Sequence, residues 1–405
     1  MQKSIYWGFG LLVLLLGVGY VLTPSIELFY RWTIGLGFGY ALVRASMGFA
    51  GGVNRLVRAN SATLAQSLMV LFVVTAVLTS FIIYGNESAY DLSIYPINSA
   101  LIMGGVLFGV GMALSSCCAT GSLTDLSSGF SRAAVTIFFF GMGVFAGFGV
   151  QQSSFVTASW VTSSTGAAHK GGLFLPDIFS AFSPLGSYIM ALVVTALLAS
   201  LVGYLAHRYA RQNATSTPAP TASTPPSLAV RLFVAPWAMR VSILIIALLF
   251  GALLFFYAKG WSASSAFGLW FGKLLLLVGV DAQTLSAFTH KSATFFTTPL
   301  WSHGTSIQNF GIIMGAVLYL TMAGTFATKF RASLRLSMKD VAVFAAGGLL
   351  MGFGTRLSNG CNVGALYTPI AELSLSGWVY LVVVVTGGFV GNWLSSRYIY
   401  PTCKV

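Results

Sequence analysis

Apolar stretches about as long as a membrane-spanning helix recur along the whole 405-residue sequence. Because 56% of the residues are hydrophobic and only 7% are charged, solvation alone would not keep the chain dispersed in water. A bilayer core takes roughly 20 apolar residues per helix. The sequence therefore predicts an all-α polytopic membrane protein embedded in a lipid bilayer. We expect spans at 5–23, 34–52, 65–84, 98–114, 132–151, 185–206, 239–258, 266–280, 309–328, 340–357 and 376–397. Two are weaker, because 34–52 contains Arg44 and 266–280 is short and contains Lys273.

The Lys and Arg residues lie at the ends of the predicted spans. Despite a net charge of +13, they form no folded basic domain, so nucleic acid is not expected as a partner. They gather in three loops, near 55–58, 208–240 and 329–339. The positive-inside rule places these loops in the cytoplasm and the acidic segment 85–97 outside. We expect both chain termini in the cytoplasm.

The segment "QNATSTPAPTASTPPSL" (212–228) divides the chain into two halves. Its composition predicts a flexible cytoplasmic linker over 208–238, between a first membrane repeat at 1–207 and a second at 239–405. The halves repeat each other, since "GGVLFGVGMALSSCCATGSL" (104–123) aligns without a gap with "GGLLMGFGTRLSNGCNVGAL" (347–366). The alignment pairs Cys118 with Cys361 and Cys117 with Gly360.

The two repeats are expected to cross the membrane in opposite directions. Under the orientation above, 98–114 runs inward and 340–357 runs outward. Pseudo-symmetric inverted repeats place a binding site near the bilayer midplane, where discontinuous helices meet, which is a common plan of secondary transporters. The basic loops 208–240 and 329–339 are both expected in the cytoplasm. The number of crossings between residues 239 and 309 agrees with this only if 266–280 or 285–308 fails to cross the membrane fully.

The segments 115–129 and 358–374 are too short to span and too polar to face lipid. We interpret each as a re-entrant half-helix with a cysteine near its N-terminus at the midplane. Helix N-termini favour anions, and a thiol adds a soft, polarizable sulfur, so a small anion carrying a soft sulfur atom would suit the pair. The predicted substrate-binding residues in these segments are Cys117, Cys118, Gly121, Gly360, Cys361, Asn362 and Gly364.

Arginines inside predicted spans are the second candidate feature. Arg44 and Arg356 are costly in a membrane unless they are paired or face a cavity, so either could supply positive potential to an anion path. For Arg356 the alternatives are snorkelling to the interface or pairing with Glu372 or Asp125.

Other interpretations of the cysteines stay open at this point. A buried cysteine is often a small hydrophobic residue, but its repeated position in two broken helices favours a function. The chain lacks the ligand spacing of a zinc site, and no cofactor or catalytic residue is predicted. A soft-metal permease or a membrane sulfur-transfer or redox enzyme would use the same thiols. The oligomeric state is not readable from the sequence.

The segments "GVGMALSSCCATGSL" and "GFGTRLSNGCNVGALYTPIAELSLSGW" resemble the glycine-cysteine signatures of the YeeE/YedE family of sulfur-transport membrane proteins. The resemblance covers both halves, outside the linker and the loop 152–184. It implies a protein of the bacterial inner membrane that moves thiosulfate, or a related sulfur or selenium species, into the cytoplasm. It also implies that Cys118 and Cys361 meet the substrate in turn through S–H···S contacts, and that a small cytoplasmic sulfur-carrier protein is a partner.

The sequence departs from the family pattern at one position. "YALVRASMGFAGGVNRL" resembles the family segment in which an Arg is followed four residues later by a Cys and then a Phe, but Gly48 stands in that place here. A third thiol is therefore missing from the relay unless Cys117 replaces it.

Overall fold

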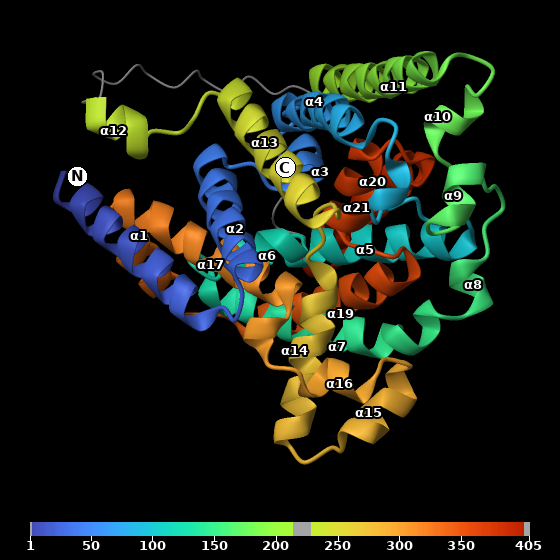
Figure 1. Ribbon diagram of the computed structural model, residues 1–405. Helices are drawn as coiled ribbons and strands as arrows, with labels where there is room; N and C mark the ends of the chain where they lie inside the picture. Colours follow the sequence, from blue (N-terminus) through green and yellow to red (C-terminus); the bar gives the residue numbers. More distant parts are fainter. Residues whose placement is uncertain (1, 214–227, 401–405) are drawn as a thin grey trace.

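The computed structural model describes residues 2–213 and 228–400, and within those ranges every regular element is a helix (Figure 1). The elements are α1 Gln2–Leu22, α2 Ile26–Ala45, α3 Phe49–Arg58, α4 Thr63–Ile83, η1 Glu87–Ala89, α5 Ser99–Ser115, α6 Ala119–Asp125, α7 Phe130–Gln151, α8 Ser154–Thr157, α9 Ser164–Ala168, α10 Leu175–Ile178, α11 Pro184–Gln212, α12 Leu228–Phe233, α13 Met239–Tyr257, α14 Ser264–Leu277, α15 Ala282–Thr289, α16 Ala293–Thr297, η2 Leu300–Ser302, α17 Gly304–Met322, α18 Phe326–Ala332, α19 Met338–Leu357, η3 Asn362–Tyr367, α20 Thr368–Ala371, α21 Leu375–Leu394 and η4 Ser395–Ile399. The middle of the predicted linker, 214–227, and Cys403 lie outside the described residues.

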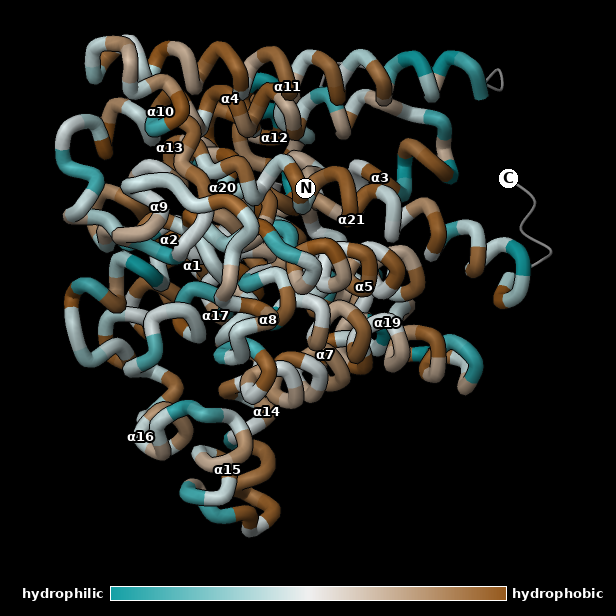
Figure 2. Tube along the Cα trace, turned by 90° about the vertical axis from the view of Figure 1, so that its right-hand side faces the viewer, coloured by the Kyte–Doolittle hydropathy of each residue, from teal (hydrophilic) through white to brown (hydrophobic). Residues whose placement is uncertain are grey.

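Nine helical segments of the described chain are long and apolar enough to cross a membrane. They are Lys3–Leu22, Thr63–Ile83, Ser99–Asp125, Phe130–Gln151, Pro184–Gln212, Met239–Tyr257, Gly304–Met322, Met338–Ala371 and Leu375–Ile399. Exposed large apolar side chains are frequent on α1, α11 and α13, as expected of surfaces that face lipid. Hydrophobic residues recur along the trace of α11 (Figure 2). The chain is therefore an all-α polytopic membrane protein.

Two of the eleven predicted spans are wrong as single crossings. The span 34–52 breaks after α2, because Ser46 adopts a left-handed conformation with φ 50° and α3 starts afresh at Phe49. The helix α14 has 14 residues, about 21 Å, which is short of the roughly 30 Å hydrocarbon core. The segment 285–308 forms short helical pieces and the start of α17, so it does not cross on its own.

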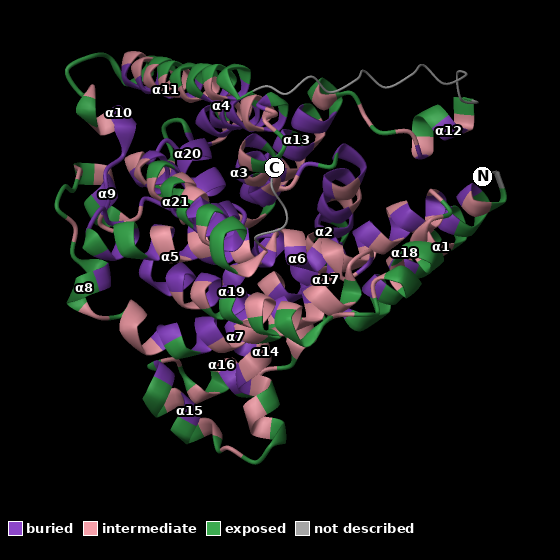
Figure 3. Cartoon of the chain, turned by 180° about the vertical axis from the view of Figure 1, so that it is seen from behind, coloured by how far each residue is buried: buried purple, intermediate pink, exposed green. Residues whose placement is uncertain are grey.

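Four helices, α5, α7, α19 and α21, pack together in the centre of the molecule, where few residues are exposed (Figure 3). Glycines let α5 and α19 approach closely: a Cβ on Gly104 would lie 2.7 Å from the carbonyl oxygen of Gly354, and a Cβ on Gly111 would lie 2.5 Å from that of Gly347. The start of each helix therefore meets the end of the other, and the two helices are antiparallel.

The loops gather at two opposite ends of this bundle. At one end, called here the Arg58 end, the Phe130 N–H donates to Ser333 Oγ at 2.9 Å and Arg58 Nε donates to Asn392 Oδ1 at 2.7 Å. At the other, the Asp91 end, the Asp91 N–H donates to the carbonyl oxygen of Ala258 at 2.7 Å. These contacts join loops from both halves of the sequence at each end.

Candidate functional site

Cys118 lies at a break between two helices. After α5 ends, Ser116 adopts a left-handed conformation with φ 59°, and Cys118 becomes the N-cap of α6. Its Sγ accepts a hydrogen bond from the Gly121 N–H at 3.4 Å, and the residue is 1% exposed. Cys117 is also buried, with its Sγ 3.0 Å from Ser122 Oγ. The predicted break before Cys118 is thus present.

Cys361 lies at the corresponding break in the second half. Asn359 is left-handed after α19, and Cys361 immediately precedes η3, a turn of π-helix that continues into α20. Cys361 is 1% exposed and belongs to the same apolar core cluster as Cys118. Both cysteines are free thiols.

A polar pocket of about 430 Å³ opens next to Cys118 at the Arg58 end. It is called here the Cys118 pocket, and Cys117, Gly48 and Gly121 also line it. Its charged lining residues are Arg55, Arg58, Asp125, Arg132 and Lys329. With four basic groups against one acidic group, the pocket favours an anion.

A second polar pocket, of about 480 Å³, opens at the Asp91 end next to Arg356. This Arg356 pocket is also lined by Trp261, Ser264 and Gly364. Its charged lining residues are Asp91, Lys170, Lys259, Lys291 and Arg356. It has the same four-to-one excess of basic over acidic groups, so it favours an anion as well.

Arg356 is a buried cation held by neutral groups. Its Nη2 donates to Ser264 Oγ at 2.6 Å and its Nη1 to Gln151 Oε1 at 3.3 Å, while its side chain is 4% exposed. No ion pair among the described residues includes Arg356. The alternative of pairing with Glu372 or Asp125 is wrong.

Both of those carboxylates have other partners. Asp125 forms an ion pair with Arg132, and Glu372 accepts a hydrogen bond from the Ser93 N–H at 2.5 Å. The positive charge of Arg356 is thus left without a counter-ion from the described chain, next to a pocket that can hold one.

The two pockets lie at opposite ends of α7. Arg132, near the start of α7, lines the Cys118 pocket, and Phe148, near its end, lines the Arg356 pocket. Sixteen residues of α-helix separate these positions by about 24 Å along the axis. The pockets share no lining residue, and members of the one apolar core cluster that contains both cysteines line each of them.

The other predicted residues of the cysteine segments lie around this core. Gly364 lines the Arg356 pocket, and a Cβ on Gly360 would lie 2.6 Å from the backbone N of Ala365. Asn362 is buried and donates to Met112 Sδ at 3.1 Å, while its Oδ1 has no partner in the described chain. Glycine at 360 is therefore needed for backbone packing, and glycine at 364 leaves the pocket wall open.

Arg44 is buried but lines neither pocket. Its Nε donates to the carbonyl oxygen of Ala235 at 2.9 Å and its Nη2 to that of Arg231 at 3.0 Å. The guanidinium also stacks over the Trp237 ring, 4.3 Å from its centroid. These contacts fasten the segment after α12 to α2, and a role for Arg44 in an anion path stays a prediction.

Sequence reasoning missed the three lysines of the Arg356 pocket. Lys170 and Lys259 both pair with Asp91, and together they outweigh its burial and hold the pKa of that carboxyl below its ordinary value. Lys291 joins them from a loop distant in sequence. The available signal was three isolated lysines in loops on the predicted outer side, where the positive-inside rule expects few.

A metal cluster is not found in the described ranges, since no three His, Cys, Asp or Glu side chains gather there. The fold and site together define a class: a polytopic helical membrane protein with a cationic pocket at each end of a thiol-containing core, as in membrane transport proteins. The comparison with known families agrees. The Sulphur transport family model matches residues 44–390, and the chain belongs to this family.

Relatives extend this result. The thiosulfate transporter TsuA of Spirochaeta thermophila is 24% identical over 90% of this chain and 99% of the relative. TsuA of Escherichia coli K12 is 23% identical over 90% of this chain and 93% of the relative. The probable transporter YedE of E. coli K12 is 29% identical, but the match spans 34% of this chain and only about a third, 32%, of YedE. The predicted YeeE/YedE resemblance is confirmed.

Proposed function

We propose that the protein is a permease for thiosulfate or a closely related small sulfur anion, which passes between the Arg356 pocket and the Cys118 pocket. One observation carries this proposal: Arg356 is buried beside a pocket and has no carboxylate partner in the described chain. A buried cation held only by neutral groups is costly, and an anion in the pocket would offset that cost.

The charge of both pockets supports an anion over a cation as cargo. A soft metal ion would meet four basic groups and one acidic group at each end of its path. A soft-metal permease is therefore the weaker candidate, although the thiols would suit it. Selenium analogues of the sulfur anion share its charge and shape and stay within the proposal.

The thiols give the path its preference for sulfur. Gly364 lines the Arg356 pocket, and Cys361 precedes it by three residues in the sequence. Cys118 itself lines the Cys118 pocket. In this proposal a substrate sulfur contacts the Cys361 thiol and then the Cys118 thiol as a weak, polarizable partner, and no covalent bond forms. Since the two pockets share no lining residue and both cysteines are 1% exposed, each transfer in this proposal involves a rearrangement of the helix breaks.

The two halves act as inverted repeats in this proposal. The gap-free alignment pairs Gly104 with Gly347 and Gly111 with Gly354, and the contacts join Gly104 to Gly354 and Gly111 to Gly347. An exchange of partners of this kind is what a pseudo-two-fold axis between α5 and α19 would produce. The breaks that carry Cys118 and Cys361 would then face each other across the midplane.

The direction follows from the charged loops. The Arg58 end carries the loops that the positive-inside rule assigns to the cytoplasm, so the Cys118 pocket opens inward and the Arg356 pocket faces the outside of a bacterial inner membrane. Both chain ends lie on the cytoplasmic side in this arrangement. A cytoplasmic sulfur-carrier protein would collect the cargo at the Cys118 pocket.

Uptake of isotope-labelled thiosulfate into proteoliposomes tests the proposal, with labelled sulfate as the matched substrate. Sulfate has the same charge and a similar shape but lacks the terminal soft sulfur, so we expect uptake of thiosulfate to exceed that of sulfate at least about tenfold. Equal uptake of both anions would contradict a role for the thiols. Mass spectrometry of the protein after uptake separates the permease from a sulfur-transfer enzyme, which would retain a persulfide on Cys118 or Cys361.

A further inference from the structure

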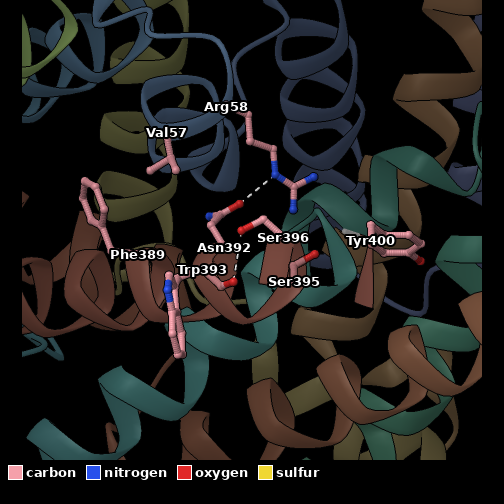
Figure 4. Close-up of a pocket in the computed structure, with 8 residues that line it drawn as sticks. All are labelled: Val57, Arg58, Phe389, Asn392, Trp393, Ser395, Ser396 and Tyr400. Atoms are coloured by element: carbon pink, nitrogen blue, oxygen red, sulfur yellow. Dashed lines mark hydrogen bonds between the residues drawn. The ribbon is translucent and has the colours of Figure 1, made fainter. Parts of the chain in front are cut away.

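A small pocket of about 340 Å³, called here the Arg58 pocket, lies beside the Arg58 end of α21 (Figure 4). Arg58 is hydrogen-bonded to Asn392 in its wall, and Ser395, Ser396 and Tyr400 also line it. Arg58 is exposed, but its guanidinium is fixed by the 2.7 Å bond to Asn392 and by a bond from Nη2 to the carbonyl oxygen of Ala113 at 3.3 Å. The pocket presents one positioned cation, a group that binds phosphate, while the Ser396 hydroxyl donates to the carbonyl oxygen of Trp393 at 3.0 Å and the Tyr400 hydroxyl donates to Asp340.

An apolar groove of about 370 Å³ continues from this pocket. Phe389 lines both, and the groove runs on between α4, α11 and α21. Its rim includes Val382 and Leu205, whose side chains are 65% and 52% exposed on surfaces that face the bilayer. Because a groove open to the hydrocarbon region excludes water, its natural occupant is a hydrocarbon chain.

The groove reaches the substrate region. Phe49 and Met112 line its inner part, together with Asn362, the residue that follows Cys361. The Oδ1 atom of Asn362 is buried and has no partner in the described chain. An occupant of the groove would therefore touch the helix break that carries Cys361.

We propose that this composite site binds one anionic glycerophospholipid of the surrounding bilayer, with its phosphate against Arg58 and an acyl chain in the groove beyond Phe389. The Arg58 guanidinium and the groove match the phosphate and the acyl chain of such a lipid in chemistry and in order. Trp393, 57% exposed, lines the Arg58 pocket, a position typical of aromatic residues at the membrane interface. Arg58 also lines the Cys118 pocket, so lipid retention is measured in the absence of the transported substrate.

Native mass spectrometry of the purified protein tests the site, using phosphatidylglycerol and phosphatidylcholine with the same acyl chains. We expect the wild type to retain one phosphatidylglycerol with about tenfold preference over phosphatidylcholine, and Arg58→Gln to lose that preference. Arg397→Gln is the matched control, because Arg397 is exposed and lines neither the pocket nor the groove.

A second variant tests the groove separately from the charge. Val385→Phe places a ring in the groove, and we expect it to abolish retention of both lipids, whereas Val390→Phe on the same helix lies outside the groove and should bind as the wild type does. Equal retention of both lipids by the wild type, or wild-type retention by both Arg58→Gln and Val385→Phe, would overturn the proposal. Displacement of the lipid by millimolar inorganic phosphate would also overturn it, since the groove would then contribute nothing.

Discussion

A single side chain, Arg356, links the fold to the proposed chemistry. Its position near the end of α19 places it in the pocket wall, and its neighbours Ser264 and Gln151 orient the guanidinium without neutralising it. Neutral hydrogen-bond partners leave the positive potential available to an incoming anion. At the residue scale, the proposed function therefore has the substrate recognised first by charge and only afterwards by the thiols.

Replacing Arg356 with Gln should lower thiosulfate uptake in proteoliposomes by about tenfold to a hundredfold, because a charge-assisted hydrogen bond is worth about 1.5–3 kcal/mol. Arg356→Lys should retain part of the uptake, because it keeps the charge and loses the fork geometry. Arg331→Gln, at an exposed site outside both pockets, is the control. Wild-type uptake by Arg356→Gln would remove the basis of the anion proposal.

The glycines of the two breaks should respond differently to alanine. At Gly121 an added Cβ would make ordinary contacts, 3.5 Å from Cys117 Cβ and 3.6 Å from Cys118 Sγ, so Gly121→Ala should fold normally and reduce uptake by crowding the thiol. At Gly360 the 2.6 Å approach to backbone should lower the melting temperature. Thermal unfolding in detergent, measured beside uptake, checks both expectations; a stable Gly360→Ala protein would contradict the second.

At the scale of elements, the breaks after α5 and α19 follow from sequence, and other boundaries do not. The runs of Ser, Asn and Gly around each cysteine predict an interruption, because such segments cannot face lipid. The break after α2 was missed because Arg44 and Ser46 are single polar residues within an otherwise apolar run. The π-helical turn after Cys361 has no local sequence signal that distinguishes it from the α-helical turn after Cys118.

Packing of α5 against α19 depends on glycine. A valine at Gly111 would place its Cβ 2.5 Å from the carbonyl oxygen of Gly347, so Gly111→Val should destabilise the protein by about 1–3 kcal/mol or more. Gly10→Val on α1 is the matched control, since nothing lies within 4 Å of a Cβ at that position. Thermal unfolding in detergent should show a lower melting temperature for the first variant only; equal melting temperatures would contradict the packing described.

At the scale of the whole molecule, residues far apart in sequence meet at each end of the bundle. The Cys118 pocket collects Arg55, Arg132 and Lys329 from three separate helices, α3, α7 and α18. Charge patterning predicted that Arg55 and Lys329 share one side of the membrane, but not that they line one pocket with Arg132. The contacts of Arg44 with the segment after α12 were equally unpredictable, because nearly 190 residues separate the partners.

The Asp91 cluster joins three loops at the other end through its bonds to Lys170 and Lys259. These bonds depress the pKa of Asp91 in the folded state below its ordinary value of 3.8. They therefore stabilise the fold fully at a pH above 3.8, and this stabilisation is lost as the pH falls through the lower pKa of the folded state. The melting temperature of the wild type should exceed that of Asp91→Asn at pH 7, and the difference should shrink below about pH 4. A difference independent of pH would contradict this account.

The central claim, that both Cys118 and Cys361 belong to one sulfur path, is tested most directly by thiosulfate uptake in proteoliposomes that contain the single and double Cys→Ala variants. Ser242→Ala, which removes a buried polar atom from α13, controls for general effects of a core substitution. We expect each single cysteine variant to lose most of the uptake and the double variant to be no worse than the more severe single variant, while Ser242→Ala transports like the wild type. Normal uptake by the double variant would show that the thiols are structural and that the anion takes another route.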